Sequence, residues 1–251
     1  MELFELVKLT EMMLNNNTLT GLVPPAIEDL SSLVTLTLFQ NKLSGELPKE
    51  IGMLQKLEIL FLYDNQFSGQ IPLEMGNCSS LTMVDFYRNH FSGEIPVTFG
   101  RLSQFNFTHL RQNKLSGEIP ATFGNFHWLT VIDMASLVVL GLASCSFSRL
   151  IPPQLGRISS LENLVIEENN LEGPIPRELG NCLSLVAFRT SVNNLNGSIP
   201  DELCHLENHR ALNLANTSLS GEIPSMIGEL SQLAYLNLLG NLLKEQIPKL
   251  I

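Results

Sequence analysis

The side chains with the greatest potential for chemistry are a cysteine and two histidines near the carboxyl end. Cys204-His205 is followed after three intervening residues by His209, a spacing that could supply half of a metal site. A structural zinc ion needs four ligands, and no second pair accompanies this one. His209 also falls where an inward-facing leucine is expected. The sequence therefore predicts no metal site and no cofactor.

The other cysteines give no sign of reactivity. Cys78 and Cys182 share the context G-N-C-x-S-L, which indicates equivalent core positions in a repeat and not a bonded pair. Cys145 stands where most copies of the repeat have asparagine, so we interpret it as a structural substitute. Four cysteines are too few and too scattered for a disulfide framework.

Motifs typical of enzymes are missing from the sequence. It contains no glycine-rich phosphate loop, no H-E-x-x-H motif and no kinase-type H-R-D or D-F-G. The formal net charge of −10 argues against nucleic-acid binding, which depends on clustered Lys and Arg. No apolar run approaches the roughly 20 residues of a membrane-spanning helix, and the first five residues lack the basic and apolar regions of a secretory signal. We expect neither an enzyme, nor a nucleic-acid partner, nor a membrane span.

An internal repeat sets the elements that must position any binding residue. The best copy, residues 57–76, gives the template L-x-x-L-x-L-x-x-N-x-L-S-G-x-I-P-x-x-x-G. Its proline recurs every 24 residues, with a single step of 32, and an asparagine usually precedes it by seven residues. The prolines are Pro24, Pro48, Pro72, Pro96, Pro120, Pro152, Pro176, Pro200, Pro224 and Pro248.

The template predicts an α/β leucine-rich-repeat right-handed solenoid of about ten repeats. L-x-x-L-x-L indicates a short strand whose leucines face inward while the x residues face solvent. The asparagine side chain can bond the backbone between coils, and Ile-Pro gives an extended segment that cannot continue a helix. One coil cannot bury its own leucines, so the coils must stack. Stacked strands then form a concave parallel sheet on the order of 45 Å long.

The 32-residue step marks an interruption near Ala135-Ser136, which separates block 1–135 from block 136–251 of a single solenoid. Residues 129–134 and 137–142 both read as strands, yet parallel neighbours need a crossover of a dozen or so residues. Either 16 residues of one repeat are missing or 8 are extra. We expect one segment to take the sheet position and the other to bulge out as a loop; an irregular register is the alternative.

Polar residues also occupy positions that the template reserves for leucine. They are Thr108, Thr190 and His209. An unpaired buried polar group costs about 1–3 kcal/mol. Neither end shows a paired-cysteine cap, which suggests a segment of a longer solenoid.

The surface with most information is the set of x positions, because residues 24 apart lie side by side on adjacent strands. In the first block these columns hold aromatic residues interleaved with charged ones, a pattern that suits binding of an extended peptide. A solvated face with scattered aromatic residues is the alternative. The predicted ligand-binding residues are Phe61, Tyr63, Asp85, Tyr87, Arg88, His109 and Arg111. The same columns are blander after the interruption, where we expect less binding.

Five N-x-S/T sequons provide weak evidence for a secreted history. The candidate glycosylation sites are Asn16, Asn77, Asn106, Asn196 and Asn216. Asn106 and Asn216 are expected to project from the sheet face, where a glycan would obstruct a concave ligand.

The stretch L-S-G-x-I-P, as in LSGELP at 43–48, FSGQIP at 67–72 and LSGEIP at 115–120, resembles the plant-specific class of leucine-rich repeats. In that class this stretch forms a second short strand in each coil and gives the solenoid a superhelical twist. Such solenoids are typically ectodomains of receptor-like kinases and receptor-like proteins. The resemblance implies a plant source and an extracellular or plasma-membrane-associated setting. It also implies a peptide or protein partner, possibly with a co-receptor.

A finer resemblance is to the GASSHO class of receptor kinases, which perceive sulfated Casparian-strip peptides. It is carried by LEILFLYDNQFSGQI (57–71), DFYRNHFSGEIP (85–96) and LEGPIPRELGNC (171–182). The second block resembles repeats nearer the amino end of such an ectodomain and the first block resembles later ones. Two hypotheses follow: a peptide-binding fragment of a receptor, or a rearranged or chimeric remnant without a ligand of its own.

Overall fold

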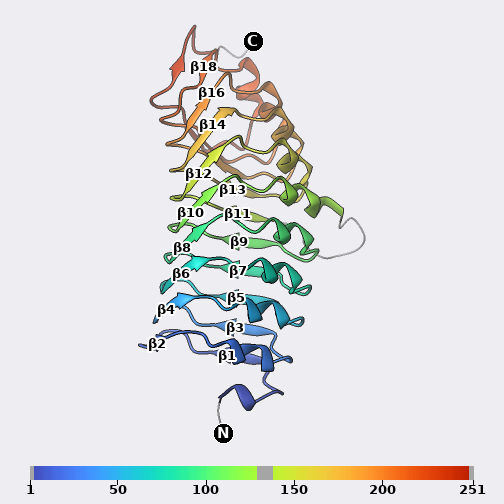
Figure 1. Ribbon diagram of the computed structural model, residues 1–251. Coiled ribbons are helices and arrows are strands. Elements are labelled where there is room, and N and C mark those ends of the chain that lie inside the picture. Colours follow the sequence, from blue (N-terminus) through green and yellow to red (C-terminus); the bar gives the residue numbers. More distant parts are fainter. Residues whose placement is uncertain (1–2, 129–137, 249–251) are drawn as a thin grey trace.

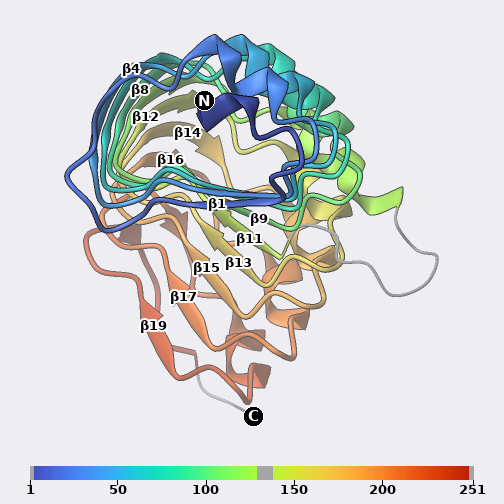
Figure 2. The same ribbon diagram turned by 90° about the horizontal axis from the view of Figure 1, so that it is seen from below.

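The computed structural model describes residues 3–128 and 138–248. Coils of one kind are stacked along a single axis, each made of an inner strand, a second short strand and a 3-10 helix (Figure 1). Viewed along the stack, the later strands are rotated progressively away from the first ones (Figure 2). The predicted leucine-rich-repeat solenoid, with its superhelical twist, is confirmed.

Ten inner strands form one parallel sheet within the described residues. Each has three residues and is the x-L-x part of the template, with the inward residue at its centre. Leu36, Leu60 and Val84 lie opposite one another in register and are all fully buried. The strands are β1 (Glu11–Met13), β3 (Thr35–Thr37), β5 (Ile59–Phe61), β7 (Met83–Asp85), β9 (Phe107–His109), β11 (Val139–Gly141), β13 (Asn163–Val165), β15 (Ala187–Arg189), β17 (Ala211–Asn213) and β19 (Tyr235–Asn237).

The L-S-G stretch forms a second set of parallel strands, as the plant-type template implies. Its glycines adopt positive φ angles, for example 74° at Gly69, which other residues adopt only at a cost. Arg149 and Glu245 replace this glycine and keep the positive φ. Eight strands make one sheet and the last two described make another. They are β2 (Thr20–Gly21), β4 (Lys42–Glu46), β6 (Gln66–Gln70), β8 (His90–Gly93), β10 (Lys114–Gly117), β12 (Ser146–Arg149), β14 (Asn170–Pro174) and β16 (Asn194–Asn196), then β18 (Ser220–Gly221) and β20 (Leu242–Leu243).

The helices in the described residues are all of the 3-10 type. From the second coil onward they follow the Ile-Pro step and complete the return to the next inner strand in about five residues, too few for a stable α-helix. They are η1 (Leu3–Glu5), η2 (Pro25–Asp29), η3 (Lys49–Met53), η4 (Leu73–Asn77), η5 (Val97–Arg101), η6 (Ala121–Trp128), η7 (Pro153–Arg157), η8 (Arg177–Asn181), η9 (Asp201–His205) and η10 (Ser225–Glu229).

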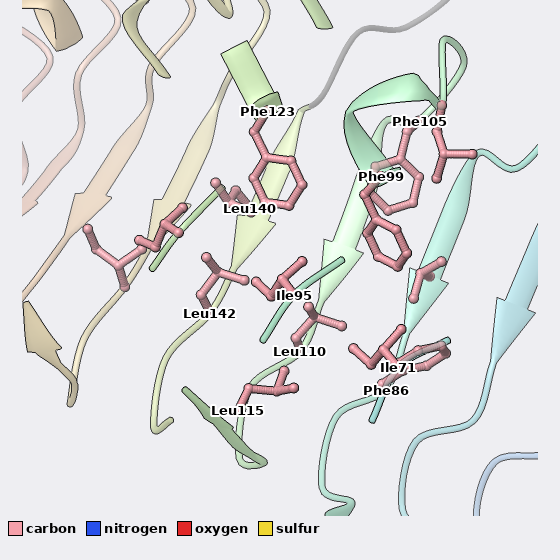
Figure 3. Packing of buried hydrophobic residues seen from close by; sticks show 14 of the residues in the cluster. Ile71, Phe86, Ile95, Phe99, Phe105, Leu110, Leu115, Phe123, Leu140 and Leu142 are labelled. Atoms are coloured by element: carbon pink, nitrogen blue, oxygen red, sulfur yellow. The ribbon is translucent and has the colours of Figure 1, made fainter. Parts of the chain in front are cut away.

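The core runs continuously through the stack and fills the space between the inner strands and the helices. Phe99 and Phe105 meet edge to face with ring centroids 5.6 Å apart, and Leu110 and Leu142 extend the packing into the following coils (Figure 3). Leucines from neighbouring coils lie against one another, so each coil depends on the next for burial.

The asparagines form the predicted ladder between coils. Asn65 Nδ2 donates to the carbonyl oxygen of Leu38 in the previous coil at 2.9 Å and to that of Leu62 in its own coil at 3.0 Å, while its Oδ1 accepts from the N–H of Leu43. Asn41, Asn89, Asn113, Asn169, Asn193 and Asn241 repeat the pattern. Cys145 partly replaces it: its thiol lies 3.5 Å from the Leu110 carbonyl oxygen.

The interruption is bridged by the second of the two expected segments. Val139–Gly141 of segment 137–142 forms β11, which pairs with β9 on one side and β13 on the other. The inner sheet therefore continues across the join. The expectation of a loop at 129–134 falls outside the described residues.

Thr108, Thr190 and His209 are all buried at leucine positions, as predicted. Thr108 Oγ1 and His209 Nε2 have no hydrogen-bond partner. His209 Nδ1 lies 3.0 Å from the Leu185 carbonyl oxygen, and burial lowers the pKa of the imidazole. No helix in the described parts of the chain is long and apolar enough to span a bilayer.

Candidate functional site

The seven predicted binding residues lie together on the first block of the solenoid. The strand register places Phe61, Asp85 and His109 opposite one another on β5, β7 and β9. Because alternate residues of a strand face the same side, Tyr63, Tyr87 and Arg111, two residues further on, continue that face. All six are half-buried, whereas Arg88 at the adjoining turn is exposed. We call these seven residues the aromatic-ionic face.

Two stacked ring pairs organise this face. Tyr63 stacks on Phe39 of the preceding coil, with ring centroids 4.3 Å apart and planes 9° from parallel. Tyr87 stacks on the His109 ring of the following coil at 4.9 Å and 8°. Stacked pairs contribute about 0.5–1.5 kcal/mol beyond area burial and fix the orientation of each ring. The face is therefore preorganised before any ligand arrives.

Polar contacts and one ion pair connect the rings to neighbouring turns. Asp85 Oδ2 lies 3.3 Å from His109 Nδ1, and Asp85 Oδ1 accepts a hydrogen bond from the Tyr87 backbone N–H. Arg88 Nη1 lies 3.3 Å from Asp64 Oδ1, and its guanidinium carbon is 5.8 Å from the centre of the Tyr87 ring. Burial, together with the carboxylates of Asp85 and Asp64, raises the pKa of Tyr63. Tyr63 therefore presents a neutral hydroxyl to a ligand.

Arg111 differs from its neighbours in having unused hydrogen-bonding capacity. Its Nε is buried without a hydrogen-bond partner, and it forms no ion pair with another described residue. A guanidinium has five N–H donors and binds carboxylate or sulfate-like oxygens in a fixed geometry. Among the seven residues, Arg111 is the one with a buried polar atom that has no partner among the described residues.

The join closes one side of the face. Gly141 lies opposite His109 on β11, and a Cβ at that position would be 3.1 Å from His109 Cδ2. Ala143, two residues on, is also buried. The small residues at this strand let the side chains of β9 lie close to it.

The columns after the join, expected to be bland, contain a polar network on three neighbouring strands. Glu167 Oε1 accepts hydrogen bonds from Ser191 Oγ at 2.8 Å and from Asn213 Nδ2 at 2.7 Å. Most of this polarity is satisfied internally, and the aromatic stacking of the first block is missing from these positions. Sequence analysis left Phe39 and Asp64 out of the face, although both stand in its columns and contact its members.

The remaining candidate residues do not converge on a reactive centre. The described residues hold no group of three or more His, Cys, Asp or Glu side chains arranged for a metal ion. All four cysteines are free thiols, and burial raises the pKa of Cys78 and Cys182 to about 12. Of the sequon asparagines, Asn16, Asn77, Asn196 and Asn216 are exposed and Asn106 is half-buried.

A model of the Leucine Rich Repeat family matches residues 8–30, 32–54, 56–78, 80–102 and 160–182. Together with the stacked parallel strands and the asparagine ladder, this match defines the chain as a leucine-rich-repeat solenoid. Comparison with curated proteins gave no match.

Among solved structures, the chain is closely similar to ectodomains of plant receptor kinases. One is the ectodomain of GASSHO1/SCHENGEN3 from Arabidopsis thaliana in complex with Casparian strip integrity factor 2, with a TM-score of 0.85 and 42% identity over 98% of this chain and 31% of that one. Another is the plant peptide hormone receptor RGFR1 with RGF2, at 0.80 and 32% over 96% and 41%. A third is the Arabidopsis HAESA ectodomain with an extended IDA peptide, at 0.77 and 33% over 97% and 44%. The chain thus spans less than half the length of each of these receptor chains.

Proposed function

We propose that this chain is a non-catalytic peptide-binding module, part of a plant receptor-kinase ectodomain of the GASSHO class, and that it works outside the cell. The observation that carries the proposal is the aromatic-ionic face. Stacked aromatic rings and charged side chains are concentrated on and beside three adjacent strands of a solenoid similar to receptors solved with peptide ligands.

The face has the composition expected of a peptide-binding surface. Aromatic side chains provide most of the binding energy when a ligand covers them, and a few charged groups fix its register. Tyr63 and Phe61 offer rings 6.5 Å apart for apolar ligand side chains, and Arg111 offers a guanidinium that forms no ion pair with another described residue. A ligand running across β5, β7 and β9 would meet the apolar part first and the cationic part last.

We also propose that blocks 1–135 and 136–251 are two receptor segments joined in non-family order within one solenoid. Continuity of the inner sheet across β9, β11 and β13 supports a folded join. Mass spectrometry of the protein from its native tissue would test it. A peptide spanning residues 130–145 is expected, whereas its absence, with both blocks found only in separate longer chains, would refute a natural join.

Binding is tested by isothermal titration calorimetry with three synthetic peptides, Casparian strip integrity factor 2, RGF2 and IDA. A displayed library of random 12-residue peptides is also selected on the chain, and the selected peptides are measured in the same way. We expect at least one binder, whose affinity falls at least tenfold in Tyr63→Ala and in Arg111→Ala. Val165→Ala, which truncates a half-buried side chain in the column of Phe61 and His109 beyond the join, is the control and is expected to bind normally.

The alternative is a remnant that keeps the fold without a ligand. Failure of all three peptides and of the library to bind the folded chain would establish it. Binding that survives Tyr63→Ala and Arg111→Ala but is lost in Val165→Ala would instead move the site into the second block.

An extracellular setting predicts N-glycans at the exposed sequons that lie away from the face. We propose Asn77, in η4, and Asn196, in β16, as the principal sites. Intact-mass measurement before and after glycosidase treatment of protein secreted from plant cells tests this. A mass unchanged by the enzyme would contradict it.

A further inference from the structure

A second exposed surface lies away from the inner sheet, between the second strands and the 3-10 helices. In the view along the stack, the helices and the inner sheet lie on different sides of each coil (Figure 2). A groove of about 930 Å³ lies here along the segments that join β8 to η5, β10 to η6 and β12 to η7, and Glu172 of β14 completes its lining. It crosses the join and shares no residue with the aromatic-ionic face.

The groove is bordered by an apolar stripe that the repeat does not require. The residue directly after the repeat proline is Leu73, Val97, Ala121 and Pro153 in four successive coils, and all four are exposed. The stripe is flanked by Lys49 in the coil before and Arg177 in the coil after. Leu73 and Val97 are 60% and 59% exposed, whereas the apolar side chains of the core are almost completely buried. A contiguous exposed apolar stripe with polar borders is typical of an interaction site.

Leu150 widens the stripe at the join. The equivalent position, two residues before the repeat proline, holds Glu46, Gln70, Glu94 and Glu118 in the preceding coils. Leu150 is 54% exposed and lies against Gly173, just as Glu46 lies against Gly69. The backbone at this position thus accommodates either a carboxylate or an apolar side chain, as Leu22 in the first coil also shows. Leu150 is the apolar residue that this position contributes to the groove lining.

The border of the groove is acidic. Glu94, Glu118 and Glu172 line it and are exposed, and none of them forms an ion pair with another described residue. Arg149 is the single cation in the groove lining. Three carboxylates against one guanidinium leave a net negative border around an apolar floor, which favours a partner that carries positive charge beside its apolar side chains.

The spacing of the stripe indicates the shape of that partner. Neighbouring strands of the stacked coils are about 5 Å apart, and the helices η4 to η7, one from each coil, pack side by side. Side chains three or four residues apart on an α-helix are about 5–6 Å apart, whereas alternate side chains of an extended strand are about 6.5–7 Å apart. A helix therefore keeps its apolar side chains in step with successive coils over the whole stripe, and a strand does not.

We infer that this groove is a docking surface for an amphipathic helix of a partner protein, with apolar residues on one face and Lys or Arg along its edges. Leu73, Val97, Pro153 and Leu150 receive the apolar side chains, and Glu94, Glu118 and Glu172 pair with the flanking cations. The surface is independent of ligand binding at the inner sheet, so the chain can hold a peptide and this partner at the same time.

The test uses the full chain and a fluorescein-labelled, end-capped 18-residue peptide with Leu every three or four residues and Lys or Ala elsewhere. Its affinity is measured by fluorescence anisotropy at 150 mM salt for the wild-type chain, Val97→Glu, Leu150→Glu and Leu183→Glu. Leu183 is 62% exposed and does not line the groove, so Leu183→Glu adds the same charge elsewhere and is the matched control. Leu150→Glu restores the residue type of the earlier coils and is not expected to affect folding, which circular dichroism verifies.

We expect Val97→Glu and Leu150→Glu to weaken binding at least tenfold, although their added negative charge would strengthen a purely electrostatic attraction. Leu183→Glu should stay within twofold of wild type. A version of the peptide with Glu in place of Lys should lose binding, and one with alternating Leu and Lys, which forms a strand, should bind more weakly. A photo-crosslinking version should label tryptic fragments from residues 94–122 or 149–172.

Equal affinity for all four proteins, or crosslinks confined to the inner sheet, would overturn the assignment of the groove. Equal binding of the Glu-containing peptide would overturn the cationic partner, and tighter binding of the strand-forming peptide would overturn the helix. Because the aromatic-ionic face is untouched in each variant, failure here leaves the result of the peptide titrations unchanged.

Discussion

Thr108 offers a stringent test of how the core is described, because its replacement should stabilise the protein. Thr108 is at the centre of β9, is fully buried, and its Oγ1 has no hydrogen-bond partner. The residue opposite it on β7 is Val84, also fully buried. Valine has the shape of threonine with a methyl group in place of the hydroxyl. Thr108→Val therefore removes the unpaired polar group and keeps the packing.

The expected gain follows from the burial. A buried polar group without a partner costs about 1–3 kcal/mol, and burial of one more methyl group contributes about 0.8 kcal/mol. Both residues are β-branched, so the strand preference changes little. Unfolded chains bury part of this surface already, which lowers the sum. We expect the free energy of unfolding to rise by about 1–2 kcal/mol, or a few degrees in Tm for a chain of this size.

The measurement is urea denaturation followed by circular dichroism, with Thr190→Val as the matched control. Thr190 is equally buried at the next inward position of the template, directly after β15, but Asn193 Nδ2 lies 3.4 Å from its Oγ1. Its replacement removes a contact as well as a hydroxyl and should be close to neutral. If Thr108→Val lowered stability, or Thr190→Val gained as much, the unpaired hydroxyl would not be the cost that the structure indicates.

Three further measurements test other parts of the fold. Cys145→Asn should restore the ladder contact to the Leu110 carbonyl oxygen and raise stability by about 1 kcal/mol in the same denaturation assay, whereas Cys145→Ala should not. Burial raises the pKa of Cys78 and Cys182 to about 12, and that of Cys145 and Cys204 to about 11. None of the four thiols should therefore react with Ellman's reagent at pH 8 until the chain is unfolded. Rapid labelling of the native protein would contradict this. Burial lowers the pKa of His209, so the unfolded state takes up the proton first and stability is lost as pH falls below about 6.5. His209→Leu should reduce the drop in Tm between pH 7.5 and pH 5, and an unchanged drop would show that His209 is not its source.

Most of the fold follows from the sequence because one constraint is repeated in every coil. A strand needs inward leucines two residues apart, and the ladder needs an amide that both donates and accepts, which only a few residue types provide at that position. The positions of Leu60, Asn65 and Gly69 in one coil therefore predict those of the others. The sequence also contained a signal for the join, since the template continues after 137–142 through Cys145 and Pro152.

The candidate site was less predictable. The repeat shows which residues are neighbours on adjacent strands, but it does not show the conformations of their side chains. The pattern places Tyr87 beside His109, but only the side-chain geometry shows that their rings stack at 8° and that Asp85 bonds the imidazole. Glu167 appeared in a bland column, yet it accepts hydrogen bonds from two neighbouring strands. Such contacts depend on side-chain rotamers, which a repeat template does not specify.

The join gives these separate observations a common origin. Where the 24-residue period fails, β11 and the residues after it contribute Gly141 and Ala143 to the inner surface, and the same coil contributes Leu150 to the groove behind it. Small residues on the inside end the aromatic-ionic face, and an apolar residue on the outside completes the stripe. A solenoid coil is thin enough that one irregular repeat changes both of its surfaces at once. The irregular coil therefore borders both proposed surfaces of this chain. Its small residues Gly141 and Ala143 end the aromatic-ionic face, and Leu150 extends the apolar stripe of the groove.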